Sequence, residues 1–458
     1  MRRLLLLVVA GALAVVAVTL PRPEAPEGPS FTGAAVIDDI AGAQGSVWYC
    51  PWMNAGAIRD AYLMLGTVPN VEVEVTLPSP VPNEDADRAL STILGPGAEA
   101  LEVASIVRRG DAPGFVEFDD GPAAVSAVVT SDSIVTGDRC VASVPKLWHL
   151  PGGTTRPGRL TTLRLFNPFP EAAKVTVAGT SEFGEVGLVG LTSLDVPGRF
   201  WEDIDLNEIV PLLDDLSLTV SAEEGLVIPS LVVSTDLDEA SWPGTGLSPV
   251  WEFPVVTQTG LVPSLIISNP GDAEAQIEVD VYTSEGSVEA VRTAVAAPRT
   301  PVRIEIGDLA DRFFAIRVRA SEPVSAVVVA EDLVQSVAEE AQDPEEVVAQ
   351  RIAGTVGVPE PANRWLLTGP GGVRTATSTM WIMNSGANPV TVSILPLGSQ
   401  SGTADKVQLE GGTVRRVVLS QASGVSGYLL EAQSPISAAW SIEAGDGVAF
   451  VSGISIDG

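Results

Sequence analysis

Very few residues of this chain could carry histidine-dependent chemistry. Its 458 residues include one histidine, His149, so a Ser-His-Asp or Cys-His site would have to use that residue. His149 stands in the segment 148–151, one of several similar segments, and we expect it to cap a strand edge or to face solvent. One histidine and two cysteines are too few for a zinc site of the usual spacing, and no phosphate-binding glycine motif is present. The sequence therefore predicts no catalytic residue, no metal site and no cofactor.

Carboxylates are abundant, with 58 Asp and Glu residues in the chain. A glycosidase holds two carboxyl groups about 5–10 Å apart in a cleft, and no spacing in this sequence identifies such a pair. Three acidic clusters, at 119–120, 236–239 and 343–346, have oxygen ligands of the kind that Ca²⁺ prefers, but none has the D-x-[DN]-x-[DN]-G spacing. We interpret these clusters as solvated acidic loops.

The two cysteines, Cys50 and Cys140, are predicted to form a disulfide. They stand near the two ends of the segment 43–144, which we interpret as one β-sandwich domain, and the first and last strands of a sandwich are often close. A bridge that closes a loop of about 90 residues stabilises a fold by about 4–5 kcal/mol on the loop-entropy model. The alternative is two free buried thiols, but paired cysteines are typical of exported proteins.

Four tryptophans begin four copies of one long unit, and we call them the leading tryptophans. Their spacing is roughly one hundred residues, which makes each copy a whole domain instead of a solenoid turn. After each of them come an apolar run, in most copies a turn such as Asn167-Pro168, and an alternating run such as 390–394. We interpret them as structural residues that fill the space between two sheets or pack against the preceding domain. The four leading tryptophans are Trp48, Trp148, Trp251 and Trp365.

Short alternating strands, with turns every 8–12 residues, are typical of antiparallel sandwiches. We therefore predict an all-β fold of four tandem immunoglobulin-like β-sandwiches. The alternative is a β-propeller with blades of about fifty residues, which we disfavour because the two halves of a unit differ. In the third unit, two separate strands are expected at 316–320 and 323–329. Within the repeat region, the one expected helix lies at 336–352 in an acidic insert, where Pro344 would interrupt it.

The N-terminal segment favours export. Arg2 and Arg3 precede an apolar run from Leu4 to Leu20, which as a helix is about 25 Å long. We expect a retained single-pass membrane anchor, with a cleaved signal peptide as the alternative. The predicted division is a signal or anchor helix at 1–20, an extended linker at 21–42, sandwiches at 43–144, 145–246, 247–334 and 362–458, and an acidic insert or linker at 335–361.

The N-terminal apolar segment, the Trp-x-Cys-Pro start at Trp48 and the repeated apolar run, Asn-Pro turn and Val-x-Val strand resemble an uncharacterised family of exported actinobacterial proteins. The resemblance covers most of residues 40–458, and the family's domain has no known function. A single unit also resembles the immunoglobulin-like modules of bacterial surface proteins. Both resemblances imply an envelope setting, the first one hints at cell-wall glycan assembly, and neither supplies a catalytic residue.

Three functions follow from these observations. The preferred one is a non-enzymatic envelope scaffold that holds a partner protein or a wall polysaccharide. The second is an array of carbohydrate-binding modules that uses exposed tryptophans, and the third is a wall hydrolase or transferase with paired carboxylates. The net charge of −32 disfavours nucleic acid and anionic lipid surfaces as partners, because both would repel the protein, and we expect no nucleic acid partner. The remaining tryptophans are Trp52, Trp201, Trp242, Trp381 and Trp440, and we interpret Trp242 as a loop residue that packs between domains.

Overall fold

The structure is a computed structural model. It describes residues 47–55, 59–68, 71–78, 88–94, 97–106, 110–111, 113–119, 121–131, 134–235, 238–257, 260–310, 313–332, 351–369, 376–398, 404–417, 425–445 and 447–456. The predicted anchor helix, the linker after it and nearly all of the helix expected at 336–352 lie outside these residues. Within them, no helix has both the length and the apolar character needed to cross a membrane.

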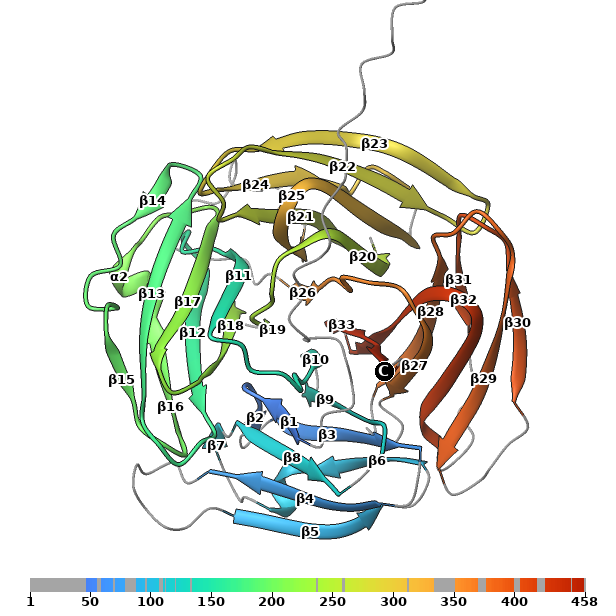
Figure 1. Ribbon diagram of the computed structural model, residues 1–458, viewed down its shortest axis with the longest axis horizontal. Coiled ribbons are helices and arrows are strands. Elements are labelled where there is room, and N and C mark those ends of the chain that lie inside the picture. Colours follow the sequence, from blue (N-terminus) through green and yellow to red (C-terminus); the bar gives the residue numbers. More distant parts are fainter. Residues whose placement is uncertain are drawn as a thin grey trace, which may run out of the picture.

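The strands fall into four consecutive groups, which we call units 1 to 4, and every strand pair is antiparallel. Each unit has two main sheets packed as a sandwich (Figure 1). The predicted all-β fold is confirmed, and the described residues form neither a propeller nor a closed barrel. The domain boundaries given above stay a prediction.

The first two units have separate strands for their two sheets. The first sheet of unit 1 has, in spatial order, the strands β1 (Val47–Cys50), β8 (Gly114–Phe118), β4 (Val71–Leu77) and β5 (Arg88–Leu94). Its second sheet has the strands β10 (Val135–Arg139), β9 (Ala123–Thr130), β3 (Asp60–Thr67) and β6 (Gly97–Glu102). Unit 1 also contains the small pair β2 (Asn54–Ala55) and β7 (Gly110–Asp111) and the 3-10 helix η1 (Val103–Ser105). The first sheet of unit 2 has, in spatial order, the strands β11 (Leu147–Gly153), β17 (Leu216–Glu224), β13 (Ala173–Ser181) and β14 (Gly184–Val186), and β15 (Leu194–Val196) also pairs with β13. Its second sheet has the strands β16 (Phe200–Asp205), β12 (Leu160–Asn167), β18 (Ile228–Ser234) and β19 (Glu239–Pro243). The unit also contains the short helix α2 (Leu206–Ile209).

The last two units each share one long strand between their sheets. Unit 3 contains β23 (Ser287–Ala296), β22 (Ala275–Tyr282), β25 (Phe313–Asp332), β20 (Ser248–Thr257), β24 (Thr300–Glu305), β21 (Leu261–Asn269) and β26 (Ile352–Val356). Unit 4 contains β30 (Asp405–Leu409), β29 (Val390–Gly398), β32 (Val425–Ala444), β27 (Ala362–Thr368), β34 (Ile454–Ser455), β31 (Thr413–Val417), β28 (Thr377–Asn384) and β33 (Gly447–Ser452).

The long strands β25 and β32, of 20 residues each, cross from one sheet to the other. β25 pairs with β22 up to Ala320 and with β21 from Ser325 onward. The prediction of two separate strands here is wrong, because Pro323 lies between these two ladders, where its missing N–H costs no ladder bond with either strand. In units 1 and 2 the corresponding path is divided by turns at Gly121 (φ 81°) and Gly225 (φ 66°).

A buried asparagine ends the same strand in three units. Asn167, Asn269 and Asn384 close β12, β21 and β28, and each Nδ2 donates to two backbone carbonyls at 2.7–3.1 Å. Each Oδ1 accepts the N–H of the residue two positions later, at 3.0–3.1 Å. The predicted turn chemistry of asparagine is therefore confirmed. In unit 1 the corresponding strand ends at Thr67, whose hydroxyl donates to the Pro122 carbonyl at 3.4 Å.

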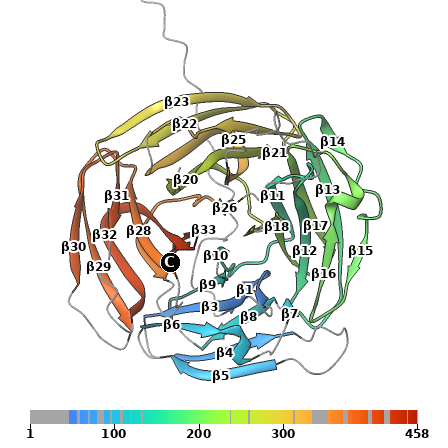
Figure 2. The ribbon, with the colours of Figure 1, turned by 180° about the vertical axis from the view of Figure 1, so that it is seen from behind.

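The four units form a ring, because unit 1 contacts unit 4 through β6 and β32 as well as β10 and β33 (Figures 1 and 2). The strands β10, β19, β26 and β33, one from each unit, lie at the centre and contact their neighbours there. Apolar cores continue across the junctions: Val327 of unit 3 belongs to the core of unit 2, and Met64 of unit 1 belongs to that of unit 4. Part of the predicted acidic linker is wrong, because residues 352–356 form β26 and pair with β25.

We expect Asn384→Ala to lower the free energy of unfolding by about 2–3 kcal/mol, because it leaves two backbone carbonyls without their buried donor. Urea denaturation of the purified protein measures this change. Asn388→Ala is the matched control, since that exposed side chain lies in the same turn and only its carbonyl is used. Equal losses in the two variants would contradict a specific role for the Asn384 amide.

Candidate functional site

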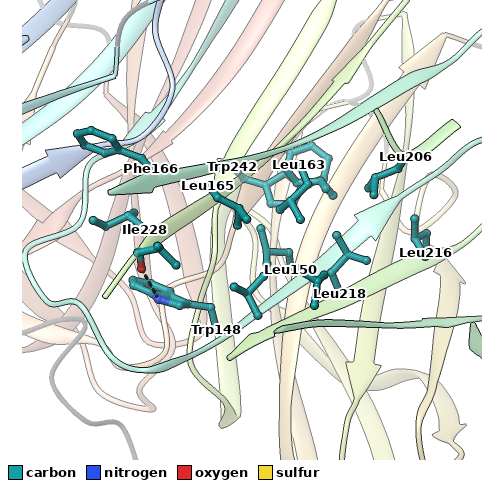
Figure 3. Packing of buried hydrophobic residues seen from close by; sticks show 14 of the residues in the cluster. Trp148, Leu150, Leu163, Leu165, Phe166, Leu206, Leu216, Leu218, Ile228 and Trp242 are labelled. Carbon is teal, nitrogen blue, oxygen red and sulfur yellow. Dashed lines mark hydrogen bonds between the residues drawn. The ribbon is translucent and has the colours of Figure 1, made fainter. Parts of the chain in front are cut away.

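The leading tryptophans lie inside the sandwiches, and none is more than 3% exposed. Three of them donate their indole N–H to a backbone carbonyl of the same unit: Trp148 to Val227 at 3.0 Å, Trp251 to Val324 at 2.8 Å and Trp365 to Ile436 at 2.8 Å. These carbonyls lie where the chain passes from one sheet to the other, just before β18 or inside β25 and β32. Trp148 is packed among buried leucines close to Ile228 (Figure 3).

Unit 1 departs from this pattern. The indole nitrogen of Trp48 is buried and has no hydrogen-bond partner among the described residues. Instead, a disulfide joins Cys50, at the end of β1, to Cys140, just after β10, with the two Cα atoms 4.6 Å apart. The predicted pairing is present, and it links the first strand of unit 1, which holds Trp48, to the central strand of that unit.

The other tryptophans offer no open platform for a sugar ring. Trp52, Trp242, Trp381 and Trp440 are at most 6% exposed. Trp201 is partly exposed and stacks on Phe200, with ring centroids 5.3 Å apart. The prediction of a loop at Trp242 is wrong, because this residue lies within β19 at the centre of the ring, where its indole N–H donates to the Pro151 carbonyl at 2.9 Å.

Two buried aspartates lie beside the central strands. Asp138 of β10 accepts N–H bonds from Arg139, at 2.7 Å, and from Val356. Asp238, next to β19, accepts N–H bonds from Glu239 at 2.9 Å and from Ile352 at 3.0 Å. Both carboxyl groups therefore bind amides of β26, which is paired with β25 on only one side. Burial raises the pKa of both carboxyl groups from 3.8 to about 7.

These residues correct the interpretation of 236–239 as a solvated loop, because Asp238 and Glu239 are only 3% and 5% exposed. Glu239 forms an ion pair with Arg59 of unit 1 at 2.6 Å. No group of three potential metal ligands occurs among the described residues. The charged centre of the ring is thus built to hold strands together, with each carboxylate bonded to backbone or to arginine.

A small cavity of about 20 Å³ adjoins Asp138 and the disulfide. Its lining includes Trp52, Ser241 and the buried guanidinium of Arg139, whose pKa is lowered by burial. The Oδ2 atom of Asp138 has no hydrogen-bond partner within the described part of the chain. The cavity has room for about one water molecule, which is too little for a substrate.

A larger groove of about 520 Å³ lies between units 2 and 3, and we call it the His149 groove. His149 is 4% exposed, so the expectation that it faces solvent is wrong; it lies on β11, the strand at one edge of its sheet. Its Nδ1 lies 3.2 Å from the hydroxyl of Thr219 on the neighbouring strand β17. Burial lowers the pKa of His149 to about 4, so the imidazole is neutral at physiological pH.

Ion pairs at the rim of the His149 groove link unit 2 to unit 3. Arg299 of unit 3 forms ion pairs at 2.7 Å with Glu185 of unit 2 and with Asp272. Its backbone has a positive φ of 53°, in the turn between β23 and β24. Leu147 also lines the groove, and it is 48% exposed. The groove combines an apolar wall with one neutral imidazole and a polar rim, a composition common in binding sites.

The chain belongs to a family of unknown function, DUF5719, whose model matches residues 103–394, more than half of its length. A search of curated proteins gives no match. Among solved structures, the crystal structure titled Thermotoga maritima 1070 is 17% identical to the chain, with a TM-score of 0.20; the match covers 24% of this chain and 93% of that one. This TM-score is too low for the likeness to carry an argument about fold or function.

We expect Trp365→Phe to destabilise the protein by about 1–2 kcal/mol more than Trp48→Phe, because only Trp365 uses its indole N–H. Both substitutions remove a similar volume from a buried site, so the packing loss cancels in the comparison. Urea unfolding curves of the two variants and the wild type give the difference. Equal losses would show that the bond to the Ile436 carbonyl adds nothing to packing.

We expect the protein to lose stability as the pH rises from 5 to 8, since the folded state raises the pKa of Asp138 and Asp238 to about 7. A raised pKa means that the folded state favours the neutral carboxyl group. The contribution of each carboxyl group to stability is therefore complete below pH 3.8 and is lost as the pH rises through 7. Thermal unfolding of Asp138→Asn and Asp238→Asn should show a smaller fall over this range. Asp195→Asn, at an exposed position, is the control and should keep the wild-type slope. An unchanged slope in both buried variants would contradict the prediction.

Proposed function

We propose that this protein is a non-enzymatic scaffold of the extracytoplasmic cell envelope, which holds a partner in the grooves between its units. The observation that carries the proposal is the ring, in which four sandwiches share apolar cores and the last unit packs on the first. Such a body keeps its grooves at constant separation, which is what a scaffold requires. A chain of independent domains would not hold its binding surfaces in this way.

An extracellular location is supported by the Cys50–Cys140 disulfide, because such bonds persist in oxidising compartments. The net charge of −32 argues against nucleic acid and anionic lipid as partners, because both would repel the protein. The N-terminal apolar segment supports a membrane anchor, and the family resemblance supports a role in wall glycan assembly.

A scaffold is favoured over a hydrolase because of the environment of the buried acids. Asp138 and Asp238 are 6% and 3% exposed and accept hydrogen bonds from backbone amides of β26. A glycosidase needs two carboxyl groups that reach a bound sugar from a cleft. The cavity beside Asp138 is about 20 Å³, so these acids serve the packing of the centre.

The experiment is site-specific photo-crosslinking in the native host. A photoreactive amino acid replaces Leu147, which lines the His149 groove, or Leu160, which is 45% exposed on β12. We expect one defined envelope component to be attached through position 147 and absent at position 160, because only the first of these two positions lines the His149 groove. Equal labelling at both positions, or cross-links to cytoplasmic proteins alone, would overturn the proposal.

A further inference from the structure

A second groove, of about 450 Å³, lies between units 3 and 4, and we call it the Phe313 groove. Its floor is held by a hydrogen bond between units, in which the Val414 N–H of β31 donates to the Thr283 carbonyl at 3.0 Å. Thr283 begins the turn between β22 and β23, and this turn is closed by its own N–H bond to Gly286 at 2.8 Å. The groove is therefore fixed by backbone on both sides before any ligand arrives.

Two aromatic rings form its apolar surface. Phe313 and Trp381 have ring centroids 4.9 Å apart and come from different units. Trp381 is 3% exposed, and its indole N–H donates to the Ser441 hydroxyl at 2.9 Å, so it serves as the buried support. Phe313 is half-buried and supplies the ring at the surface. Both rings line the groove.

Three polar side chains surround these rings. The guanidinium of Arg416 lies 5.4 Å from the centroid of Phe313, which orients its plane. Among the described residues, Arg416 has no hydrogen bond or ion pair, and the Ser284 hydroxyl and Glu285 carboxylate have no side-chain partner either. All three line the groove and are exposed. With respect to the described residues, their side-chain donors and acceptors are therefore available to a ligand.

The charge of the groove narrows the class of ligand. Among the described lining residues, one arginine and one glutamate carry opposite charges that sum to zero, and the whole chain carries −32, so a polyanion is disfavoured. A planar guanidinium and a carboxylate can each bond two neighbouring hydroxyl groups. A pyranose or furanose ring offers such hydroxyls at its edge and C–H groups on its face, which suit an aromatic ring.

We propose that the Phe313 groove binds a neutral glycan, with sugar C–H groups against the exposed part of Phe313 and hydroxyl groups on Arg416, Glu285 and Ser284. This inference deepens the proposed scaffold function by naming a wall polymer as one of its ligands, and it rests on that function for the setting. It differs from the idea of exposed tryptophan platforms, because the surface ring is a phenylalanine and the tryptophan lies beneath it.

Isothermal titration calorimetry of the full-length chain tests the proposal. The probes are neutral hexasaccharides of glucose, mannose, galactose and arabinose, with hexagalacturonate as the anionic comparison. We expect saturable binding of at least one neutral probe, weakened about tenfold or more by Arg416→Ala and by Phe313→Ala. Arg415→Ala is the matched control, because neighbouring strand residues face opposite sides and Arg415 bonds the Gln408 carbonyl at 2.9 Å. It should bind like the wild type.

Thermal unfolding of each variant separates lost binding from lost folding, and the exposed Arg416 variant remains informative if Phe313→Ala unfolds. The proposal is overturned if no neutral probe binds, if hexagalacturonate alone binds, or if Arg415→Ala weakens binding as much as Arg416→Ala. Such a failure leaves the cross-linking result at Leu147 untouched, since that position lines a different groove. A cross-linking failure with intact glycan binding would instead reject a role in holding a partner at the His149 groove.

Discussion

The bond from the indole of a leading tryptophan to the carbonyl at a sheet crossing is the interaction on which each of units 2 to 4 depends. In units 3 and 4 the long strand is the one element that belongs to both sheets, so its bend sets how the sandwich closes. The indole belongs to the same buried core as the residues at that bend, and its N–H satisfies a buried carbonyl there. Unit 1 lacks this bond within its described residues, and a disulfide supplies a covalent link between its first and central strands. In unit 1, the most divergent copy, a disulfide therefore takes the place of the indole hydrogen bond in holding the sandwich together.

The centre of the ring imposes a second constraint, because four strands meet there and the backbone N–H and C=O groups at their edges need hydrogen-bond partners. Trp242 lies so close to Gly354 that a Cβ atom on the glycine would be 2.5 Å from the indole. Glycine therefore lets β26 approach β19, while Asp138 and Asp238 accept N–H groups of β26. Acidic side chains at this position blunt a strand edge. Their buried state, and with it their raised pKa, follows from the closure of the ring.

The period of the leading tryptophans, the alternating runs and the cysteine pair were sufficient to predict an all-β chain with one disulfide, because these signals arise within single units. The central strands were not recognisable, since segments such as Val135–Arg139 and Glu239–Pro243 are short and carry glycine or charge, which usually marks a loop. The environments of His149 and Trp242 were also not predictable, because both residues are buried by neighbouring strands and units. A repeat shows that units are alike, but it does not show which faces they turn toward one another.

The same distinction explains where the grooves lie. Polar groups inside the units and at the centre are mostly paired, as the asparagine turns and the buried aspartates show. At the junctions, by contrast, two surfaces that are each folded for internal reasons meet with a gap, and Arg416, Ser284 and the ring of Phe313 stay available there. Since neighbouring units differ in sequence, the His149 groove and the Phe313 groove have different sets of side chains. Similar sandwiches in a ring thus hold two grooves of different chemistry at constant spacing, which a single sandwich cannot do.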